Sequence, residues 1–237
     1  MIRTLRNGLA RNTWWSRLLI ASTYLVSTFF YMMTNRLASN HDRAVVFKFA
    51  LDDQIPLVPF FVLFYFAWFA LVGSVFLWLV FDRRTGRAID RHTAAIVLAM
   101  VLSALVFIAW PTHVPRPEVY GDTFFRRLVL LIYSIDEPYN CFPSLHVAVA
   151  ALNGLTLYRH GPRRILFRLA AAAVVVLIML STVLIKQHFT PDILGGLALA
   201  WLCDRLAALL VKKKPAKGAV RQEIDRTGPK PGNERAT

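Results

Sequence analysis

The sequence predicts an all-α fold: a polytopic membrane protein whose six transmembrane helices form one bundle. Four long stretches carry no charged residue: 18–35, 56–81, 93–112 and 169–185. About 20 apolar residues, each rising roughly 1.5 Å, cross the hydrocarbon core of a bilayer, so these stretches have the length of spanning helices. Two weaker stretches, 138–158 and 191–211, are apolar apart from His146 in the first and three charged residues in the second. Together they predict six spans.

Taken in order, the predicted helices cover about 13–33, 56–81, 92–110, 143–158, 164–186 and 190–211. After the first helix, residues 43–51 alternate apolar and basic side chains, which suits a segment at the membrane interface. A short basic loop at 82–91 joins the second and third helices. Residues 111–140 are the longest non-spanning interior segment and contain four prolines. A loop of this length usually has a function.

The chain divides into a short N-terminal segment at 1–12, a membrane catalytic domain at 13–211 and a basic tail at 212–237. The tail is rich in Lys, Pro, Gly and Arg, so we expect it to be disordered. The first apolar stretch has no small-residue cleavage site before Arg36, so we interpret it as an anchor. Cys141 and Cys203 lie in different regions and imply no disulfide framework.

The basic residues predict the orientation of the helices. A formal charge of +14 would suggest nucleic acid in a soluble protein, but here the cations lie at helix ends. Of the 28 Lys and Arg residues, 20 lie on the side of both termini, 7 lie on the other side, and Arg205 lies within the last helix. The positive-inside rule therefore puts both termini in the cytoplasm. We expect a multi-pass inner (plasma) membrane protein with no nucleic-acid partner, its 111–140 segment facing the periplasm or exterior.

Three polar stretches fall at the external ends of the predicted helices: Arg116-Pro117, residues 142–146 and residues 186–192. Ionisable groups at such positions are costly and are by default functional. His188 and Asp192 are four residues apart, so they share one face of a helix or of its first turn. The carboxylate can then hold one imidazole nitrogen and leave the other free to attack.

The other candidates are suited to binding phosphate. His146 lies one turn into a predicted helix, just behind Ser144, and helix N-termini offer free N–H groups with a partial positive charge. Arg116 can add a bidentate contact to phosphoryl oxygens. The external loops contain no carboxylate cluster with metal-ligand spacing, so we expect no metal ion. No other cofactor is predicted.

Each of these residues also has a simpler explanation. A single histidine in a membrane helix more often makes a packing hydrogen bond, and Arg116 could anchor to lipid headgroups. A non-catalytic membrane protein, or a transporter with His146 and His188 as proton relays, is a second hypothesis. A bis-histidine haem protein is a third, in which Asp192 and Arg116 would have no task. All three motifs at one face are harder to explain as packing.

Three short motifs carry a resemblance to a known family. Arg116-Pro117, the run Pro143-Ser144-Leu145-His146, and Ser181 followed by His188-x-x-x-Asp192 resemble the signature motifs of the type-2 phosphatidic acid phosphatase superfamily. The Phe-Pro-Ser-Leu-His-Val form of the second motif and Lys-Gln-His in the third are most similar to the inositol phosphorylceramide synthase-like branch, as is Asp53-Gln54-Ile55-Pro56. The resemblance covers about residues 50–205.

The resemblance implies a role for each residue. His188 is the nucleophile that forms a phosphohistidine, Asp192 orients it, and His146 protonates the departing oxygen and then activates the acceptor. Arg116 and the region of Ser144 bind the phosphoryl oxygens. Two cations of the family pattern are absent, because Ala109 stands at the first-motif lysine and Thr182 at the third-motif arginine. Lys186, Arg126 or Arg127 could substitute for them.

The expected function is therefore lipid phosphoryl transfer at the outer membrane face, to a lipid hydroxyl or to water. The substrate is a membrane phospholipid or lipid phosphate. A phosphomonoester carries nearly two negative charges and a phosphodiester one, so fewer cations favour a diester donor and headgroup transfer. Plain hydrolysis of a lipid phosphate or pyrophosphate is the close alternative.

Overall fold

The computed structural model describes residues 43–82 and 86–211, together with five isolated helical positions, Ser22, Val26, Phe29, Met32 and Met33. Apart from those five positions, the predicted first helix at 13–33 lies outside the described residues. The segment 1–12 and the tail 212–237 also lie outside them.

The described residues form helices and no strand, as the sequence predicts. The elements are η1 (Ala50–Asp53), η2 (Pro59–Phe61), α3 (Val62–Phe81), α4 (Gly86–Ala109), α5 (Phe124–Ile135), α6 (Leu145–His160), α7 (Ile165–Leu184) and α8 (Thr190–Leu210). Four segments are long and apolar enough to cross a bilayer, namely Pro59–Phe81, Ala88–Ala109, Ile165–Leu184 and Thr190–Leu210. These four segments indicate a membrane protein. The predicted number of six spans is not confirmed, because α6 has only 16 residues and the first helix is not described.

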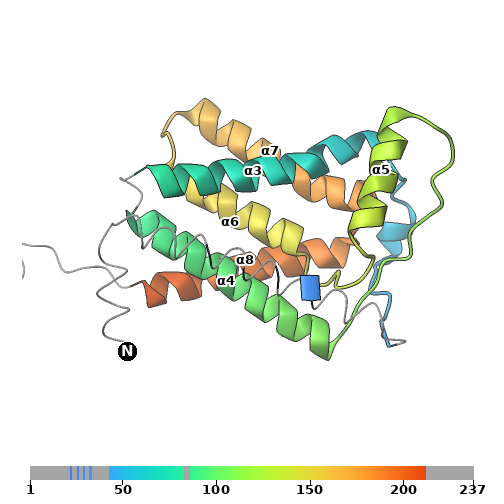
Figure 1. Ribbon diagram of the computed structural model, residues 1–237, viewed down its shortest axis with the longest axis horizontal. Coiled ribbons are helices and arrows are strands. Elements are labelled where there is room, and N and C mark those ends of the chain that lie inside the picture. The colour runs from blue at the N-terminus through green and yellow to red at the C-terminus, as the bar shows by residue number, and fades with distance from the viewer. Residues whose placement is uncertain are drawn as a thin grey trace, which may run out of the picture.

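Helix α6 is the centre of the bundle, and α3, α4, α7 and α8 pack around it (Figure 1). Its buried face is rich in small residues such as Ala148 and Ala150, which let neighbouring helices approach closely. At Gly154, an added Cβ would lie 2.9 Å from Cγ2 of Val175 on α7, so the glycine allows this close contact. Helix α5 lies across one end of the bundle (Figure 1).

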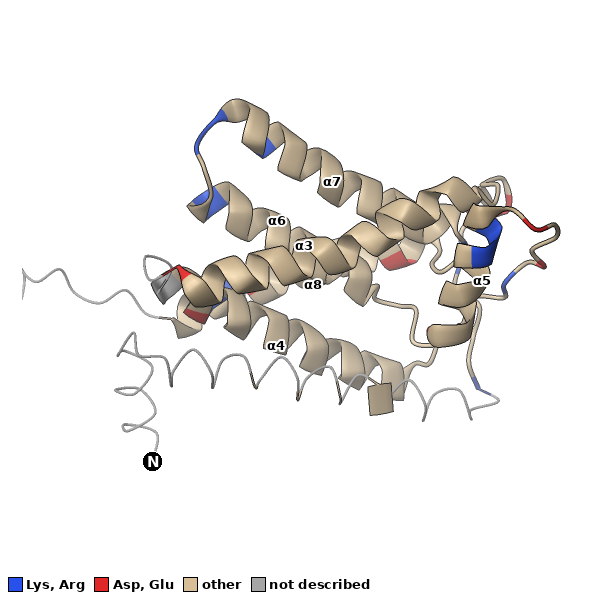
Figure 2. Cartoon of the chain, turned by 45° about the horizontal axis from the view of Figure 1, so that its top comes forward, with Lys and Arg blue, Asp and Glu red and all other residues tan. Residues whose placement is uncertain are grey.

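Charged residues gather toward the two ends of the helices, and the length between them is almost entirely uncharged (Figure 2). The exposed side chains along this length include large apolar residues such as Phe69 on α3, Leu105 on α4 and Val176 on α7. An uncharged, apolar band of this kind is the surface that a helical protein presents to lipid tails.

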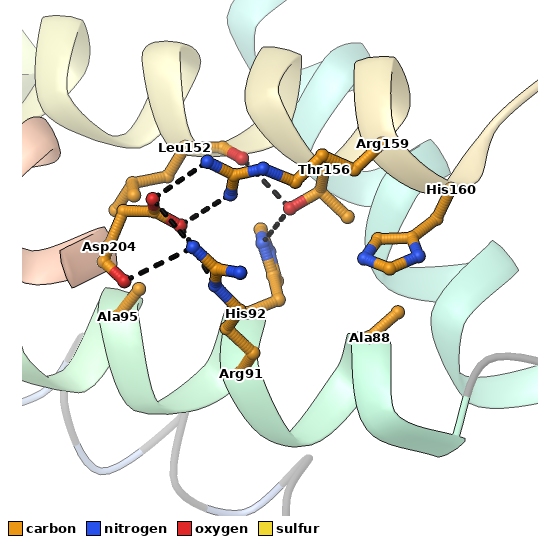
Figure 3. Close-up of a pocket in the computed structure, with 9 residues that line it drawn as sticks. All are labelled: Ala88, Arg91, His92, Ala95, Leu152, Thr156, Arg159, His160 and Asp204. Carbon is orange, nitrogen blue, oxygen red and sulfur yellow. Dashed lines mark hydrogen bonds and ion pairs between the residues drawn. The ribbon is translucent and has the colours of Figure 1, made fainter. Parts of the chain in front are cut away.

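An ionic cluster joins α4, α6 and α8 at the end of the bundle far from α5 (Figure 3). Asp204 is 5% exposed and accepts hydrogen bonds from Arg91, whose Nη2 lies 2.8 Å from Oδ2, and from Arg159, whose Nη1 lies 2.5 Å from Oδ1. Beside it, Thr156 donates to the carbonyl of Leu152, so its hydroxyl oxygen accepts from Nδ1 of His92 at 2.9 Å. The cluster ties the three helices together.

Two predicted loops contain helix. Helix α4 begins at Gly86, so residues 86–91 of the predicted loop at 82–91 are helical. Arg91, in this early part of α4, pairs with Asp204 of α8. The 111–140 segment contains α5, a strongly amphipathic helix that buries Val129 and Ile132. The buried positions are three residues apart, which is the helical spacing that reveals such an element.

Candidate active site

The candidate site is built on the first turns of α6 and α8. The backbone N–H of Ser144 donates to the carbonyl of Asp192 at 3.1 Å, which joins the two helix starts. Gly196 permits this approach, because an added Cβ would lie 2.6 Å from the carbonyl oxygen of Ser144. The N-termini of α6 and α8 therefore lie side by side.

His188 and Asp192 are in contact, as their four-residue spacing predicts. His188 lies in the loop before α8 and Asp192 in its first turn, and Nδ1 of His188 is 3.3 Å from Oδ2 of Asp192. The same Oδ2 accepts from the backbone N–H of Phe189 at 2.9 Å, which fixes the carboxylate. Asp192 is 1% exposed and His188 6%. Because this contact uses Nδ1, Nε2 is the nitrogen left for chemistry.

The His188 loop is held by backbone contacts from the end of α7. The carbonyl of Thr182 accepts from the backbone N–H groups of both Gln187 and His188, at 2.9 and 3.0 Å. Lys186, with φ of 57°, turns the chain at the start of the loop. This compact turn fixes the backbone of His188, because the backbone N–H of His188 is hydrogen-bonded to Thr182.

His146 lies in the first turn of α6 and faces His188, with 5.8 Å between the two ring centroids. Two aromatic rings of α3 pack beside it: Tyr65 at 4.7 Å and Trp68 at 4.9 Å between centroids. Trp68 also donates from Nε1 to the backbone carbonyl of His146 at 3.0 Å. The structure thus brings together the two histidines that the sequence singled out, although 42 positions separate them.

Ser144 is the N-cap of α6. It is completely buried, and its Oγ accepts from the backbone N–H of Val147 at 3.3 Å. A hydroxyl that accepts a hydrogen bond still has a proton to donate. The capping contact and a contact to a phosphoryl oxygen are therefore compatible.

Arg116 holds the loops around the site together. Its Nη1 donates to the carbonyl of Tyr133 at 2.8 Å, and its Nη2 donates to the carbonyl of Asp136 at 2.5 Å and to Oε1 of Gln187 at 2.7 Å. The guanidinium also lies 4.5 Å from the centroid of the Tyr133 ring. Burial lowers the pKa of Arg116 below its ordinary value. The fork that the sequence assigns to phosphate thus contacts the residue next to His188.

Two buried donors in this clamp have no partner among the described residues. They are Nε of Arg116 and Nε2 of Gln187. Buried N–H groups are normally hydrogen-bonded, and an orphaned donor beside a candidate catalytic histidine is suited to an anionic ligand.

Asp52 is a site residue that sequence reasoning missed. It is 2% exposed and binds Thr190 at the start of α8 twice, with Oδ1 and Oδ2 each 2.8 Å from a donor of that residue. Lys186 reinforces the junction by donating to the carbonyls of Asp52 and Ile55, at 3.2 and 2.5 Å. Burial lowers the pKa of Lys186. The predicted phosphate ligand Lys186 thus ties the η1 region to the His188 loop.

Neither of the two positions at which the family pattern has a cation holds a charged residue in this chain. Ala109 is the last residue of α4 and is exposed, and Thr182 is fully buried with its hydroxyl donating to the carbonyl of Met179. Arg127 pairs with Asp122 in the solvent-exposed part of the molecule, and the Arg126 guanidinium lies against Gly121. No group of three or more His, Cys, Asp or Glu residues that could hold a metal ion occurs in the described ranges.

The geometry is suited to chemistry in which one imidazole attacks and the other exchanges a proton. His188 presents one free nitrogen with a carboxylate behind the other, and His146 lies across from it. The N-terminus of α6, where His146 lies, adds the partial positive charge of a helix start.

The comparisons with known proteins agree with this geometry. No curated protein matches the chain. Residues 35–204 match the sequence profile of the PAP2 superfamily, and this match includes every candidate site residue. Because it covers most of the sequence, the chain belongs to the PAP2 superfamily and has the fold of a phosphatase or phosphotransferase.

Proposed function

We propose that this protein is a histidine-dependent lipid phosphotransferase or phosphatase that acts through a phosphohistidine at His188. The observation that carries the proposal is the meeting of His146 and His188, 5.8 Å apart between ring centroids, with Asp192 behind His188. In an acid–base and nucleophile pair, one imidazole must attack while the other supplies a proton.

In the first step, Nε2 of His188 attacks the phosphorus of the lipid donor. A P–N bond forms, the P–O bond to the leaving group breaks, and His146 gives its proton to the departing oxygen. Asp192 keeps Nδ1 of His188 protonated and stabilises the positive charge that develops on the ring. The N–H groups of the α6 start and the donors around Arg116 stabilise the phosphoryl oxygens.

In the second step, an acceptor hydroxyl attacks the same phosphorus. Its proton goes to His146, which is now neutral and acts as a base, and the P–N bond breaks to restore His188. The acceptor is a lipid hydroxyl in a transferase and water in a phosphatase. Both reactions use the same residues, and plain hydrolysis of a lipid phosphate or pyrophosphate is the alternative to headgroup transfer.

The positions of the cations favour a diester donor. Lys186 donates hydrogen bonds to two backbone carbonyls, and Arg116 donates three to the surrounding loops. With Ala109 and Thr182 at the positions of the family's other cations, the site suits one negative charge better than nearly two. This supports headgroup transfer, the chemistry of the inositol phosphorylceramide synthase-like branch.

The membrane setting follows from the same proposal. The catalytic domain covers 13–211, with both termini in the cytoplasm, and the site lies at the periplasmic or outer face of the inner membrane. The partners are the bilayer and its phospholipids or lipid phosphates. The distribution of the 28 basic residues supports this orientation.

Trapping the covalent intermediate tests the proposal. Purified protein is mixed with a phospholipid labelled at the headgroup phosphate, or with a labelled lipid phosphate, and quenched in base. Ceramide, diacylglycerol or no acceptor is present in parallel. We expect an acid-labile label on His188, and the product in each case shows whether a lipid hydroxyl or water receives the group.

Two variants make the result specific. His188→Ala should abolish both label and turnover, and His160→Ala, which removes a histidine at the other end of α6, should retain both. If wild type never forms the adduct and His188→Ala turns over as fast as wild type, the proposed mechanism is wrong.

A further inference from the structure

An apolar groove runs along the bundle away from the candidate active site. Helices α7 and α8 both pack against α6 but scarcely touch each other, so α6 forms the floor between them. The resulting groove has a volume of about 440 Å³. On α8 its lining extends from Leu197 to Arg205, about 12 Å along the helix axis, toward the end that is far from His188.

The lining of this groove is shaped for a hydrocarbon chain. Small residues from all three helices, including Ala151, Ala172 and Ala200, leave it open, and Leu197 and Trp201 form its side on α8. Trp201 is 61% exposed and Leu197 is 40% exposed. In a bilayer, lipid tails occupy apolar space of this kind, but apolar lining alone selects no particular lipid.

The end of the groove is basic, because each of its three helices contributes one arginine there. These are Arg159 on α6, Arg168 on α7 and Arg205 on α8. Arg168 lies 4.6 Å from the centroid of the Tyr158 ring, and Arg205 lies 5.8 Å from that of Trp201. Both guanidiniums thus lie on aromatic rings at the rim of the groove.

The charge at this end is not balanced. Asp204 is the one carboxylate among the residues that line the groove, and it is already paired with both Arg91 and Arg159 (Figure 3). Within the described part of the chain, neither Arg168 nor Arg205 pairs with a carboxylate, and the buried Nε of Arg168 has no hydrogen-bond partner. The apolar groove therefore ends at uncompensated positive charge.

We propose that this groove is a binding site for a phospholipid with an anionic headgroup. One acyl chain lies between α7 and α8 on the small residues of α6, and the headgroup phosphate lies on Arg168 and Arg205. Basic pockets between membrane helices are suited to anionic lipid headgroups, and arginine binds phosphate through paired N–H groups. This site is separate from the proposed chemistry at His188 and uses none of its residues.

Charge complementarity favours a lipid over a helix as the occupant. A helix of a second copy would cover the guanidiniums with apolar side chains and leave them without water or counter-charge, which is costly in a membrane. The predicted helix at 13–33 contains Arg17 and follows Arg11, so in the groove it would bring more positive charge to a basic end.

Native mass spectrometry with a defined lipid tests the site. The full-length His188→Ala protein, which should not consume the lipid, is titrated with phosphatidylglycerol or phosphatidylcholine of the same acyl chains. We expect tighter binding of phosphatidylglycerol, and a loss of affinity of at least about ten-fold in Arg168→Gln/Arg205→Gln. Ala172→Trp, which fills the groove without changing charge, should also weaken binding.

The matched control is Arg163→Gln/Arg164→Gln, which removes two charges from the neighbouring loop but does not alter the groove lining. This control should bind like the parent. Photoactivatable phosphatidylglycerol should label peptides within 165–176 and 197–205. Equal losses in both double variants, equal binding of the two lipids, or cross-links through the groove to a second copy or to 13–33 would each overturn the proposal.

Discussion

Helix α8 carries two buried carboxylates, and they have opposite surroundings. The carboxylate of Asp204 accepts four hydrogen bonds from the side chains of two arginines, at 2.5 to 3.1 Å. Asp192, twelve residues earlier, contacts the imidazole of His188 at 3.3 Å and a backbone N–H at 2.9 Å. One helix thus supports an ion cluster at one end of the bundle and a histidine–carboxylate pair at the other.

The difference shows how the same side chain can stabilise a fold or support chemistry. Both carboxylate oxygens of Asp204 are hydrogen-bonded to permanently charged guanidiniums, so none of these groups is available for chemistry. Asp192 has a partner whose charge can change, and the far nitrogen of that partner remains available. Permanent charges thus lie where helices must be joined, and the histidine–carboxylate pair lies where the starts of α6 and α8 meet.

We predict that the Asp204 cluster and the His188–Asp192 pair lie on opposite sides of the membrane, and this outcome is all-or-none. Cys141 is a poor reporter, because it is 3% exposed and burial raises the pKa of its thiol well above the ordinary value. In a Cys141→Ala/Cys203→Ala background, an impermeant reagent added to intact cells should label Tyr120→Cys, since Tyr120 is 74% exposed. Arg163→Cys should react only after permeabilisation. The reverse pattern would overturn the orientation.

The largest graded effect should be on turnover. Asp192→Asn keeps the shape of the side chain but removes the charge that orients and stabilises the imidazole of His188. We expect kcat to fall on the order of 10²–10⁴-fold, as in other oriented-histidine systems. The matched change at the other end, Asp204→Asn, should alter kcat by only a few-fold in protein that is correctly inserted. Equal losses in kcat would remove the distinction between the two carboxylates.

The next effect should be on stability. Asp204→Leu leaves Arg91 and Arg159 facing each other without a counter-charge. Their side chains are 29% and 32% exposed, so water can reach them in part, and we expect a loss of about 3 kcal/mol in the free energy of unfolding. Unfolding in mixed detergent micelles measures it. Arg91→Met/Arg159→Met/Asp204→Leu should recover most of this loss, and a single-variant cost below about 1 kcal/mol would mark the cluster as a surface-type pair.

The smallest effect concerns two neighbouring carboxylates near the site. Asp52→Ala removes both hydrogen bonds to Thr190 at the start of α8, and we expect a cost of about 1–2 kcal/mol in unfolding free energy together with lower kcat. Asp53→Ala is the control, since that side chain is 62% exposed and pairs only with Lys48 among the described residues. Its effect should be close to zero. Similar costs for both variants would contradict the assigned role of Asp52.

Much of the fold follows from where charges are absent. The runs 56–81 and 169–185 predict α3 and α7 closely, because a bilayer leaves helix as the only way to satisfy their backbone groups. Helix α5 was missed because prolines surround it, and its apolar face alternates with Arg126 and Arg127. Its amphipathic spacing is present in the sequence, but the uncharged run that marks a spanning helix is not.

The site was predictable where its residues are close in sequence. The contact of His188 with Asp192 follows from a spacing of four, and the meeting of His146 with His188 follows from motif order and topology. Asp52 could not be found this way, because it binds Thr190 across 138 positions and looks no different from Asp53 in the sequence. The partners of Arg116 were equally hidden, since two of them are backbone carbonyls.

The shortness of α6 affects which molecules can reach the site. Its 16 residues span about 24 Å, and a bilayer's hydrocarbon core is about 30 Å thick. Under the proposed orientation, with His160 at the cytoplasmic surface, α6 is too short to carry His146 across the whole core unless the membrane thins around it. We therefore expect His146 to lie just below the outer surface, within reach of a phospholipid in that leaflet. A lipid reaches that depth by sliding sideways within its own leaflet, whereas a water-soluble phosphate ester must leave water to arrive there.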